Sequence, residues 1–339
     1  MLKTGKILGY LEGVMVGAGL LVISLLFYRA FFVVGAEQTA ADRSSNSVPS
    51  LVGRQVFPPD DPWNTDISSE PVDPQSDELI ASIGKAAILH PNFGTVYRGA
   101  PIGVPYVIVS GDQPKVPVSF EHAAESDAGP YPIPADVLVE DGSQSNGDRH
   151  VIVLDQTHWI LYELYRAFPR DGGKRWEAVS GAVFDLNKSS SQRPVGHTSA
   201  DAAGLAIFPG LVRYDEVVGQ RKITHALRFT AERSRRGFIP PAGHFASRNT
   251  DDHLPPMGMR VRLKRDFDIS EFPDDARVIL QALKTYGMIL ADNGGNWYLS
   301  GAPDPRWNEE DIHSIRKVKG ADFEIVRMGT VITTLGKNP

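Results

Sequence analysis

The side chains best suited to acid–base chemistry fall in four polar stretches, at residues 148–150, 197–201, 225–228 and 244–253. They combine histidines and arginines with acidic side chains. Cleavage of a glycosidic bond by hydrolysis needs two carboxyl groups that face each other across the bond. The carboxylates that can serve are Asp148, Asp201, Asp215, Glu216, Asp292 and Asp304. Their number means that the sequence selects no pair.

Glu163 is the carboxylate with the most distinctive neighbours. In a strand over residues 159–165, alternation places it on one face with Trp159, Leu161 and Tyr165. A carboxyl group framed by aromatic rings can have a raised pKa and act as an acid, or can lie beside a stacked sugar ring. The alternative is an edge-strand glutamate in water, and the sequence leaves both interpretations open.

Elimination from a polysaccharide needs a different set of groups, namely a base and a cation that neutralises a uronate. His197, His225, Arg228 and Tyr214 supply such groups. Alternation over residues 223–230 places His225 among apolar residues, which favours a hydrogen-bonded core histidine over a base or a ligand. The sequence contains no zinc or calcium motif and no glycine-rich phosphate loop, so it predicts no metal and no cofactor.

A row of basic side chains follows one strand late in the chain. Arg260, Arg262 and Lys264 alternate with apolar residues over residues 259–264 and therefore point away from the core. Residues 221–265 hold 11 basic against 3 acidic residues, whereas residues 40–150 hold 16 acidic against 6 basic ones. The row predicts a surface for an anionic glycan, lipid headgroups or an acidic subunit. The alternative is pairing with the acidic N-terminal third of the same domain.

Short strands must position these groups. They are rich in β-branched and aromatic residues and are separated by Gly, Pro, Asn and Asp, and helices are expected only after Ser76, Pro273 and Asn308. Pro117 limits its strand to a sheet edge. The pattern predicts a mainly β fold, an antiparallel β-sandwich or jelly-roll-like domain with a few short helices. The expected strands are 106–109, 116–120, 151–154, 159–165, 176–184, 223–230, 259–263, 288–290, 297–300, 323–326 and 331–334.

The N-terminus predicts a single transmembrane helix. Residues 7–34 would extend about 42 Å as a helix, enough to cross a hydrocarbon core of about 30 Å. Lys3 and Lys6 predict a cytoplasmic N-terminus, which places the bulk of the chain in the periplasm of a bacterial inner membrane. Residues 9, 13 and 17 are glycines that share one helix face suited to a partner helix. The alternative is a signal peptide cleaved after Ala36.

Gly9, Gly13 and Gly17 are the predicted contacts of this span with another membrane subunit. The position of the span also divides the chain into three parts. Residues 1–36 form the cytoplasmic end and the span, and residues 37–75 form an extended Pro/Ser/Asp-rich tether. Residues 76–339 form the β-rich domain, on which Phe57 and Trp63 of the tether are expected to dock. The chain has no cysteine, so a disulfide framework and a thiolate metal site are excluded.

Several short stretches carry a resemblance to a family of secreted, β-rich proteins of bacteria and fungi. They are ESDAGPYPIP at 125–134, GDRH at 147–150, SADAAGL at 199–205, PGLVRY at 209–214, HFAS at 244–247, LPPMG at 254–258 and SGAPD at 300–304. The resemblance covers residues 57–326. It implies an extracytoplasmic domain, and it assigns no reaction and no catalytic residue. This chain differs from the secreted members of that family in its predicted membrane span with a glycine face, which would keep it attached to the membrane.

Two functional hypotheses follow. The first is an accessory subunit of a respiratory or photosynthetic inner-membrane complex, in which the span and the periplasmic domain contact partner subunits and the bilayer. The second is a membrane-tethered enzyme or binding protein for glycans, either a glycoside hydrolase or a polysaccharide lyase. The sequence favours the first, a protein that is not an enzyme, because no catalytic set has a diagnostic spacing. A net charge of −6 and an outer location argue against nucleic acid as a partner.

Overall fold

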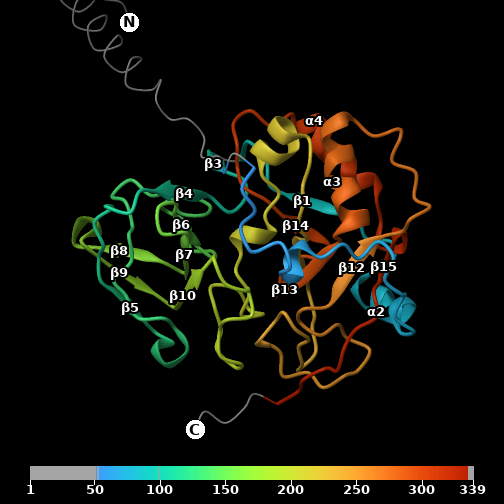
Figure 1. Ribbon diagram of the computed structural model, residues 1–339, viewed down its shortest axis with the longest axis horizontal. Coiled ribbons are helices and arrows are strands. Elements are labelled where there is room, and N and C mark those ends of the chain that lie inside the picture. The colour runs from blue at the N-terminus through green and yellow to red at the C-terminus, as the bar shows by residue number, and fades with distance from the viewer. Residues whose placement is uncertain (1–50, 52, 98, 335–339) are drawn as a thin grey trace, which may run out of the picture. The chain divides into compact units, whose positions relative to one another are not determined.

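The computed structural model describes residues 51, 53–97 and 99–334, which form a mainly β structure with several sheets and a few short helices (Figure 1). This confirms the coarse fold prediction. None of the helices in this part of the chain is both long and apolar enough to cross a membrane. The predicted span of residues 7–34, with Gly9, Gly13 and Gly17, lies outside the described residues.

The largest sheet has six strands in the order β1, β14, β11, β13, β12, β15. The central strand β11 pairs in parallel with β13 and antiparallel with β14. The strands that pair with it lie in distant parts of the sequence. This sheet therefore brings together side chains whose proximity no local sequence pattern predicts. The bounds are β1 His90–Asn92, β11 Leu227–Ala231, β12 Arg260–Leu263, β13 Met288–Asn293, β14 Tyr298–Ser300 and β15 Phe323–Ile325.

A second sheet has four strands in the order β10, β7, β6, β4 and is drawn in green in Figure 1. Strand β6 is buried along its whole length. Ile152 and Leu154 join the large core shared with the six-stranded sheet, while Val151 and Val153 join a smaller core with Trp176. Both faces of this sheet are therefore covered, which explains its nearly continuous apolar sequence. The bounds are β4 Tyr106–Val109, β6 Val151–Asp155, β7 Ile160–Tyr165 and β10 Ser180–Asp185.

Two smaller sheets complete the strands of the described residues. Strands β5, β9 and β8 form a sheet in that order, and β2 pairs with β3. Strand β5 begins directly after Pro117 and lies at the edge of its sheet, which confirms the prediction for that strand. The bounds are β2 Val96–Tyr97, β3 Ala100–Pro101, β5 Val118–Phe120, β8 Phe168–Arg170 and β9 Arg175–Ala178.

The purely antiparallel arrangement predicted from the sequence is wrong. Strand β1 pairs in parallel with β14, β4 with β6, β5 with β9, and β11 with β13. Parallel neighbours need a long connection between them, whereas antiparallel neighbours can be joined by a tight turn. Long segments separate the two strands in each of these pairs, and the strand pattern alone does not reveal which of them become partners.

The three predicted helices are present with small shifts at their ends. Helix α2 spans Ser76–Ile83, α3 spans Asp274–Thr285, and α4 spans Glu309–His313. Asn308 caps α4 by accepting hydrogen bonds from the N–H groups of Glu310 and Asp311. The shorter helical turns are η1 Pro62–Asn64, η2 Ala123–Glu125, η3 Asp171–Gly173, η4 Phe208–Gly210, η5 Asp215–Gln220, η6 Ser314–Lys317 and η7 Gly320–Asp322.

The described part of the predicted tether packs against the β-rich domain. Phe57 and Trp63 are 3% and 0% exposed, so both predicted docking residues are confirmed. The backbone carbonyl of Trp63 accepts a hydrogen bond from the N–H of Ala226, 2.7 Å away. The segment therefore belongs to the folded domain from Gln55 onward, although its composition resembles that of a linker.

The basic row on β12 contacts this same segment. Arg260 donates to the carbonyl oxygens of Pro62 and Thr65 at 2.7 and 2.9 Å, and Arg262 donates to that of Ile67 at 2.5 Å. Lys264 donates to the carbonyl of Ala321. An external anion would have to replace these bonds. Arg260 and Arg262 are thus held within the protein by backbone carbonyls, and Arg262 also pairs with Glu324 at 2.8 Å rather than with an acid of the N-terminal third. The anionic partner stays a prediction.

Candidate functional site

A cleft of about 640 Å³ opens between segments that belong to the four-stranded and six-stranded sheets. We call it the acid cleft, because Asp148, Asp201 and Asp292 line it together with Tyr165 and His244. Its size lies in the range of pockets that hold a small molecule or a short part of a polymer. The cleft joins three of the polar stretches singled out in the sequence, 148–150, 197–201 and 244–253, with residues far from them.

The two sheets determine where these side chains lie. Tyr165 ends β7 of the four-stranded sheet, and Asp292 lies near the end of β13 in the six-stranded sheet. Asp201 follows β10 in a loop, where its N–H donates to the hydroxyl oxygen of Ser199 at 2.8 Å. The cleft is therefore built on strand ends and on the loops that follow them, a common location for a functional site.

Arg228 on β11 connects the carboxylates of the acid cleft. It donates to both oxygens of Asp201 at 3.1 and 2.8 Å, to Asp292 at 3.2 Å and to the hydroxyl of Ser300 at 2.7 Å. The side chain of Asp201 is 0% exposed and that of Arg228 is 6% exposed, so this ion pair is shielded from water. Arg228, which the sequence offered as a uronate-neutralising cation, is instead engaged within the protein.

Asp292 is the acid of the cleft whose chemistry is most altered. Burial and the nearby carboxylate of Asp201 raise the pKa of Asp292 to about 7, although Arg228 opposes the shift. Arg228 offsets only part of this shift, because its one guanidinium serves two carboxylates and Asp201 takes the bidentate contact. The side chain of Asp292 remains 25% exposed. It is therefore able to hold a proton near neutral pH and to deliver that proton into the cleft.

Asp148 and Asp292 flank Tyr165. Both carboxylates, together with burial, raise the pKa of the Tyr165 phenol. Asp148 lies in an exposed turn directly before the buried pair Arg149 and His150. The cleft thus presents two carboxyl groups in different environments.

His150 is a cation rather than a base. Its Nδ1 lies 2.5 Å from an oxygen of Glu140, and its Nε2 lies 3.1 Å from the carbonyl oxygen of Ala200. Both partners are acceptors, so both ring nitrogens must carry protons. Glu140 raises the pKa of His150 to about 9 against the opposing effect of burial. The pKa of Glu140 is lowered, because its pairing with His150 outweighs its burial.

The same residues were tested as a metal centre. Glu140, Asp148 and His150 each place one ligand atom within 4.8 Å of the others, and they are the only such group in the described residues. A metal ion binds the lone pair of a neutral imidazole nitrogen. Both nitrogens of His150 donate hydrogen bonds in this structure, so the group fits an ion pair and not a metal ligand set.

The pair of His150 and Glu140 leads to a prediction for stability above neutral pH. A cation whose pKa is 6.5 when unfolded and about 9 when folded stabilises the fold fully below pH 6.5 and loses this contribution as the pH rises through 9. The shift corresponds to about 3 kcal/mol. Glu163 and Asp292, whose pKa values are raised from 4.5 and 3.8 to about 7, also contribute stability that is lost as the pH rises, but they lose it mainly below pH 7. The free energy of unfolding in urea is therefore expected to fall between pH 7 and 9 because of His150.

Glu140→Gln removes the carboxylate that holds the proton on His150, so the free energy of unfolding should change little between pH 7 and 9 in this variant. Glu121→Gln is the matched control, since Glu121 is 72% exposed and lies 4.0 Å from the half-exposed His122. The control should keep the decline of the original protein. An equal decline in Glu140→Gln would show that His150 is not the titrating group.

His244 is the histidine of the cleft with a nitrogen left for chemistry. Its Nδ1 lies 2.7 Å from the carbonyl oxygen of Ala202, so Nδ1 carries the proton. The lone pair of Nε2 is then available to accept a proton or a hydrogen bond. The sequence marked residues 244–253 as a polar stretch, and of the histidines there it is His244 that lines the cleft.

Glu163 does not face the cleft. Its side chain is fully buried, and its oxygens accept hydrogen bonds from the N–H groups of Ile207 and Phe208 at 2.9 to 3.0 Å. Burial raises the pKa of Glu163 to about 7. The raised pKa predicted for Glu163 is confirmed, but the residue is neither in water nor open to a substrate, so its predicted roles as an acid and as an edge-strand glutamate are wrong. It holds the turn η4 against β7.

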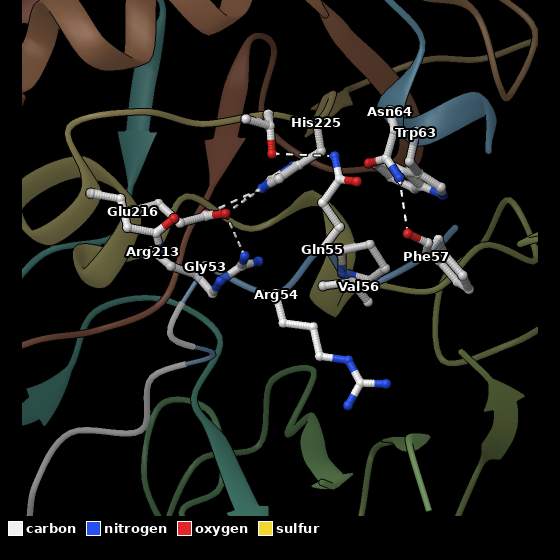
Figure 2. Close-up of a pocket in the computed structure, with 13 residues that line it drawn as sticks. Gly53, Arg54, Gln55, Val56, Phe57, Trp63, Asn64, Arg213, Glu216 and His225 are labelled. Atoms are coloured by element: carbon white, nitrogen blue, oxygen red, sulfur yellow. Dashed lines mark hydrogen bonds and ion pairs between the residues drawn. The ribbon is translucent and has the colours of Figure 1, made fainter. Parts of the chain in front are cut away.

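His225 is a buried, hydrogen-bonded histidine, as the alternation of its segment indicates. Its Nδ1 contacts the carbonyl of Ala226 at 2.8 Å, and its Nε2 contacts Glu216 at 3.1 Å. Arg213 donates to the same glutamate at 2.6 Å. Figure 2 shows these three side chains around a separate cavity of only about 10 Å³, with the segment from Gly53 beside it. This space admits little more than one water molecule.

The remaining sequence candidates do not join one catalytic set. Tyr214 packs edge to face on Trp307 with ring centres 5.1 Å apart, and Arg306 stacks over its ring. His197 lies in a half-buried loop and does not line the acid cleft. The proposed grouping of His197, His225, Arg228 and Tyr214 for elimination is therefore wrong, since His225 and Arg228 are held in two different internal networks.

Comparisons with protein-family models, with curated proteins and with solved structures found no match to this chain. The resemblance to secreted β-rich proteins therefore stays a prediction. Four of the stretches that carry it nevertheless meet at the acid cleft. They contribute Glu125 from 125–134, Asp148 from 147–150, Asp201 from 199–205 and His244 from 244–247.

Sequence reasoning named Asp292 only among many carboxylates and did not use Glu140 at all. Asp292 carries no local signal, because its altered pKa depends on Arg228 and Asp201, which lie 64 and 91 positions earlier in the chain. The Gly-Gly turn that follows Asp292 was a detectable signal, since it marks the end of a strand. That signal places Asp292 at a sheet edge without indicating its partners.

Proposed function

We propose that the acid cleft hydrolyses a glycosidic bond, with Asp292 as the general acid and Asp148 as the carboxylate that assists water. The single observation that carries this proposal is the partly exposed Asp292, whose pKa is raised to about 7 beside the ion pair of Asp201 and Arg228. Glycosidases commonly hold their acid protonated in this way and keep a second carboxylate ionised.

The reaction balances with water as the second reactant. Asp292 gives its proton to the bridging oxygen as the bond from that oxygen to the anomeric carbon breaks. Water adds to the anomeric carbon and loses a proton to Asp148, and the two carboxyl groups then exchange a proton through solvent. Tyr165 and Phe245 line the same cleft and offer aromatic surface for a sugar ring. His244 supplies a further hydrogen-bonding group at Nε2.

The experiment uses the purified full-length chain in detergent with two polymers, a polyuronate and its carboxyl-reduced neutral form. New reducing ends and ultraviolet absorbance from unsaturated ends are followed together. Hydrolysis produces reducing ends without unsaturated ends. An unsaturated product would instead indicate elimination and would contradict the roles given to Asp148 and Asp292. No product from either polymer would remove support from glycan cleavage.

The accessory-subunit hypothesis stays a prediction. It depends on a membrane span and on the face formed by Gly9, Gly13 and Gly17, and these residues lie outside the described part of the chain. The inner-membrane location and the contacts with partner subunits and lipid stay predictions for the same reason. We prefer the enzymatic proposal because the acid cleft supports it directly.

A further inference from the structure

A second cavity continues from the acid cleft. It has a volume of about 460 Å³ and is lined by Arg236, Phe245, Ser247, Arg248 and Thr334. We call it the arginine pocket. Phe245, Ser247 and Arg248 line both cavities, so the two form one groove. The groove is acidic at one end and basic at the other.

The cations of the arginine pocket are available for a ligand. Arg236 and Arg248 are both exposed, and neither makes an ion pair within the described residues. The guanidinium of Arg236 lies 5.7 Å from the centre of the Phe245 ring, which orients it along the pocket. The neighbouring Arg235 differs, because it pairs with Asp252 at 2.6 Å. Among the basic residues of 221–265, Arg235 is thus neutralised by an acidic partner, whereas Arg236 and Arg248 beside the cleft make no ion pair within the described residues.

The charge distribution limits what the groove can bind. An anionic sugar at the acid end would lie beside the exposed carboxyl group of Asp148, which is outside the buried ion pair of Asp201 and Arg228, and this placement is unfavourable. The same group in the arginine pocket would meet two guanidinium groups, which bind carboxylates through paired N–H donors. Phe245 lines both cavities and therefore lies between the two ends, where its largely buried ring contacts His244 and Arg236.

We infer that the arginine pocket binds the carboxylate of a uronate-containing glycan and directs the scissile bond into the acid cleft. This inference rests on the proposed function for its substrate class and adds the charge and the direction of the bound chain. Arg236 and Arg248 are specificity residues. They bind the substrate at its uronate carboxylate, which lies at a distance from the scissile bond. Asp292 and Asp148 act at the other end of the groove.

The test measures binding of a uronate hexasaccharide and of its carboxyl-reduced neutral form by calorimetry, with the full-length chain in detergent. The uronate is expected to bind at least about tenfold more tightly at low salt, with a difference that shrinks as salt is added. Arg248→Gln should lose about tenfold in affinity for the uronate, and Arg236→Gln combined with it should abolish the preference. Neither change should affect the neutral oligosaccharide.

Arg233→Gln is the matched control, since Arg233 is an exposed arginine of the same basic segment that does not line the arginine pocket. Equal affinity for the two oligosaccharides, or an equal loss in Arg233→Gln and Arg248→Gln, would overturn the inference. Cleavage of both polymers without a uronate preference would overturn only the arginine pocket. Uronate binding that depends on Arg248 without any cleavage would overturn only the hydrolytic proposal.

Discussion

Asp292→Asn is expected to lower kcat for glycan cleavage by about 10³-fold while the protein stays folded. The substitution removes the proton that the leaving oxygen needs, and loss of a general acid typically costs 10² to 10⁴ in rate. Asparagine has nearly the same shape and still accepts the hydrogen bond of Arg228. Arg228 also keeps its bidentate contact with Asp201 and its bond to Ser300. Affinity for the oligosaccharide should therefore change little.

The pH dependence provides an independent readout of the same residue. If Asp292 must be protonated, kcat/KM of the original protein falls as the pH rises through about 7. The residual activity of Asp292→Asn should lack this decline. Asp266→Asn is the matched control, because Asp266 is exposed and lies outside the acid cleft. An Asp292→Asn protein that retains most of its activity, or the same alkaline decline, would contradict the assignment.

The parts of the fold that depend on neighbouring residues could be predicted from the sequence. Asn308 caps α4 because a short side-chain oxygen reaches the first free N–H groups of the helix. Trp63 docks because so large an apolar side chain gains more from burial than its linker-like segment loses in entropy. On β12, Val261 and Leu263 are buried as the two-residue period requires.

The parts that depend on distant pairing could not be predicted in this way. Alternation placed Glu163 correctly within a strand, but whether its face met water or protein depended on η4, which lies more than 40 positions away. The parallel pairing of β11 with β13 places Thr230 opposite Asp292, and Arg228, two residues earlier on β11, reaches the Asp292 carboxylate at 3.2 Å. Asp292 owes its raised pKa to burial and to the carboxylate of Asp201 from a distant loop, so no local spacing encodes the acid of the cleft.

Arg228→Met is expected to lower the free energy of unfolding by about 3 to 5 kcal/mol, because it leaves the fully buried carboxylate of Asp201 without its counter-ion. Urea unfolding measures the loss, and an unchanged slope would show that the folded state keeps its compactness. Arg248→Met is the matched control, since Arg248 is exposed and makes no ion pair within the described residues, and it should change stability by less than about 0.5 kcal/mol.

The double variant Arg228→Met with Asp201→Asn separates the cost of a stranded charge from the loss of packing. Asparagine carries no charge, so the double variant should recover a large part of the stability that Arg228→Met loses. The coupling energy between the two sites should therefore be well above that of residues that do not touch. Additive losses would mean that Arg228 and Asp201 do not stabilise each other, and would contradict the role given to this buried ion pair.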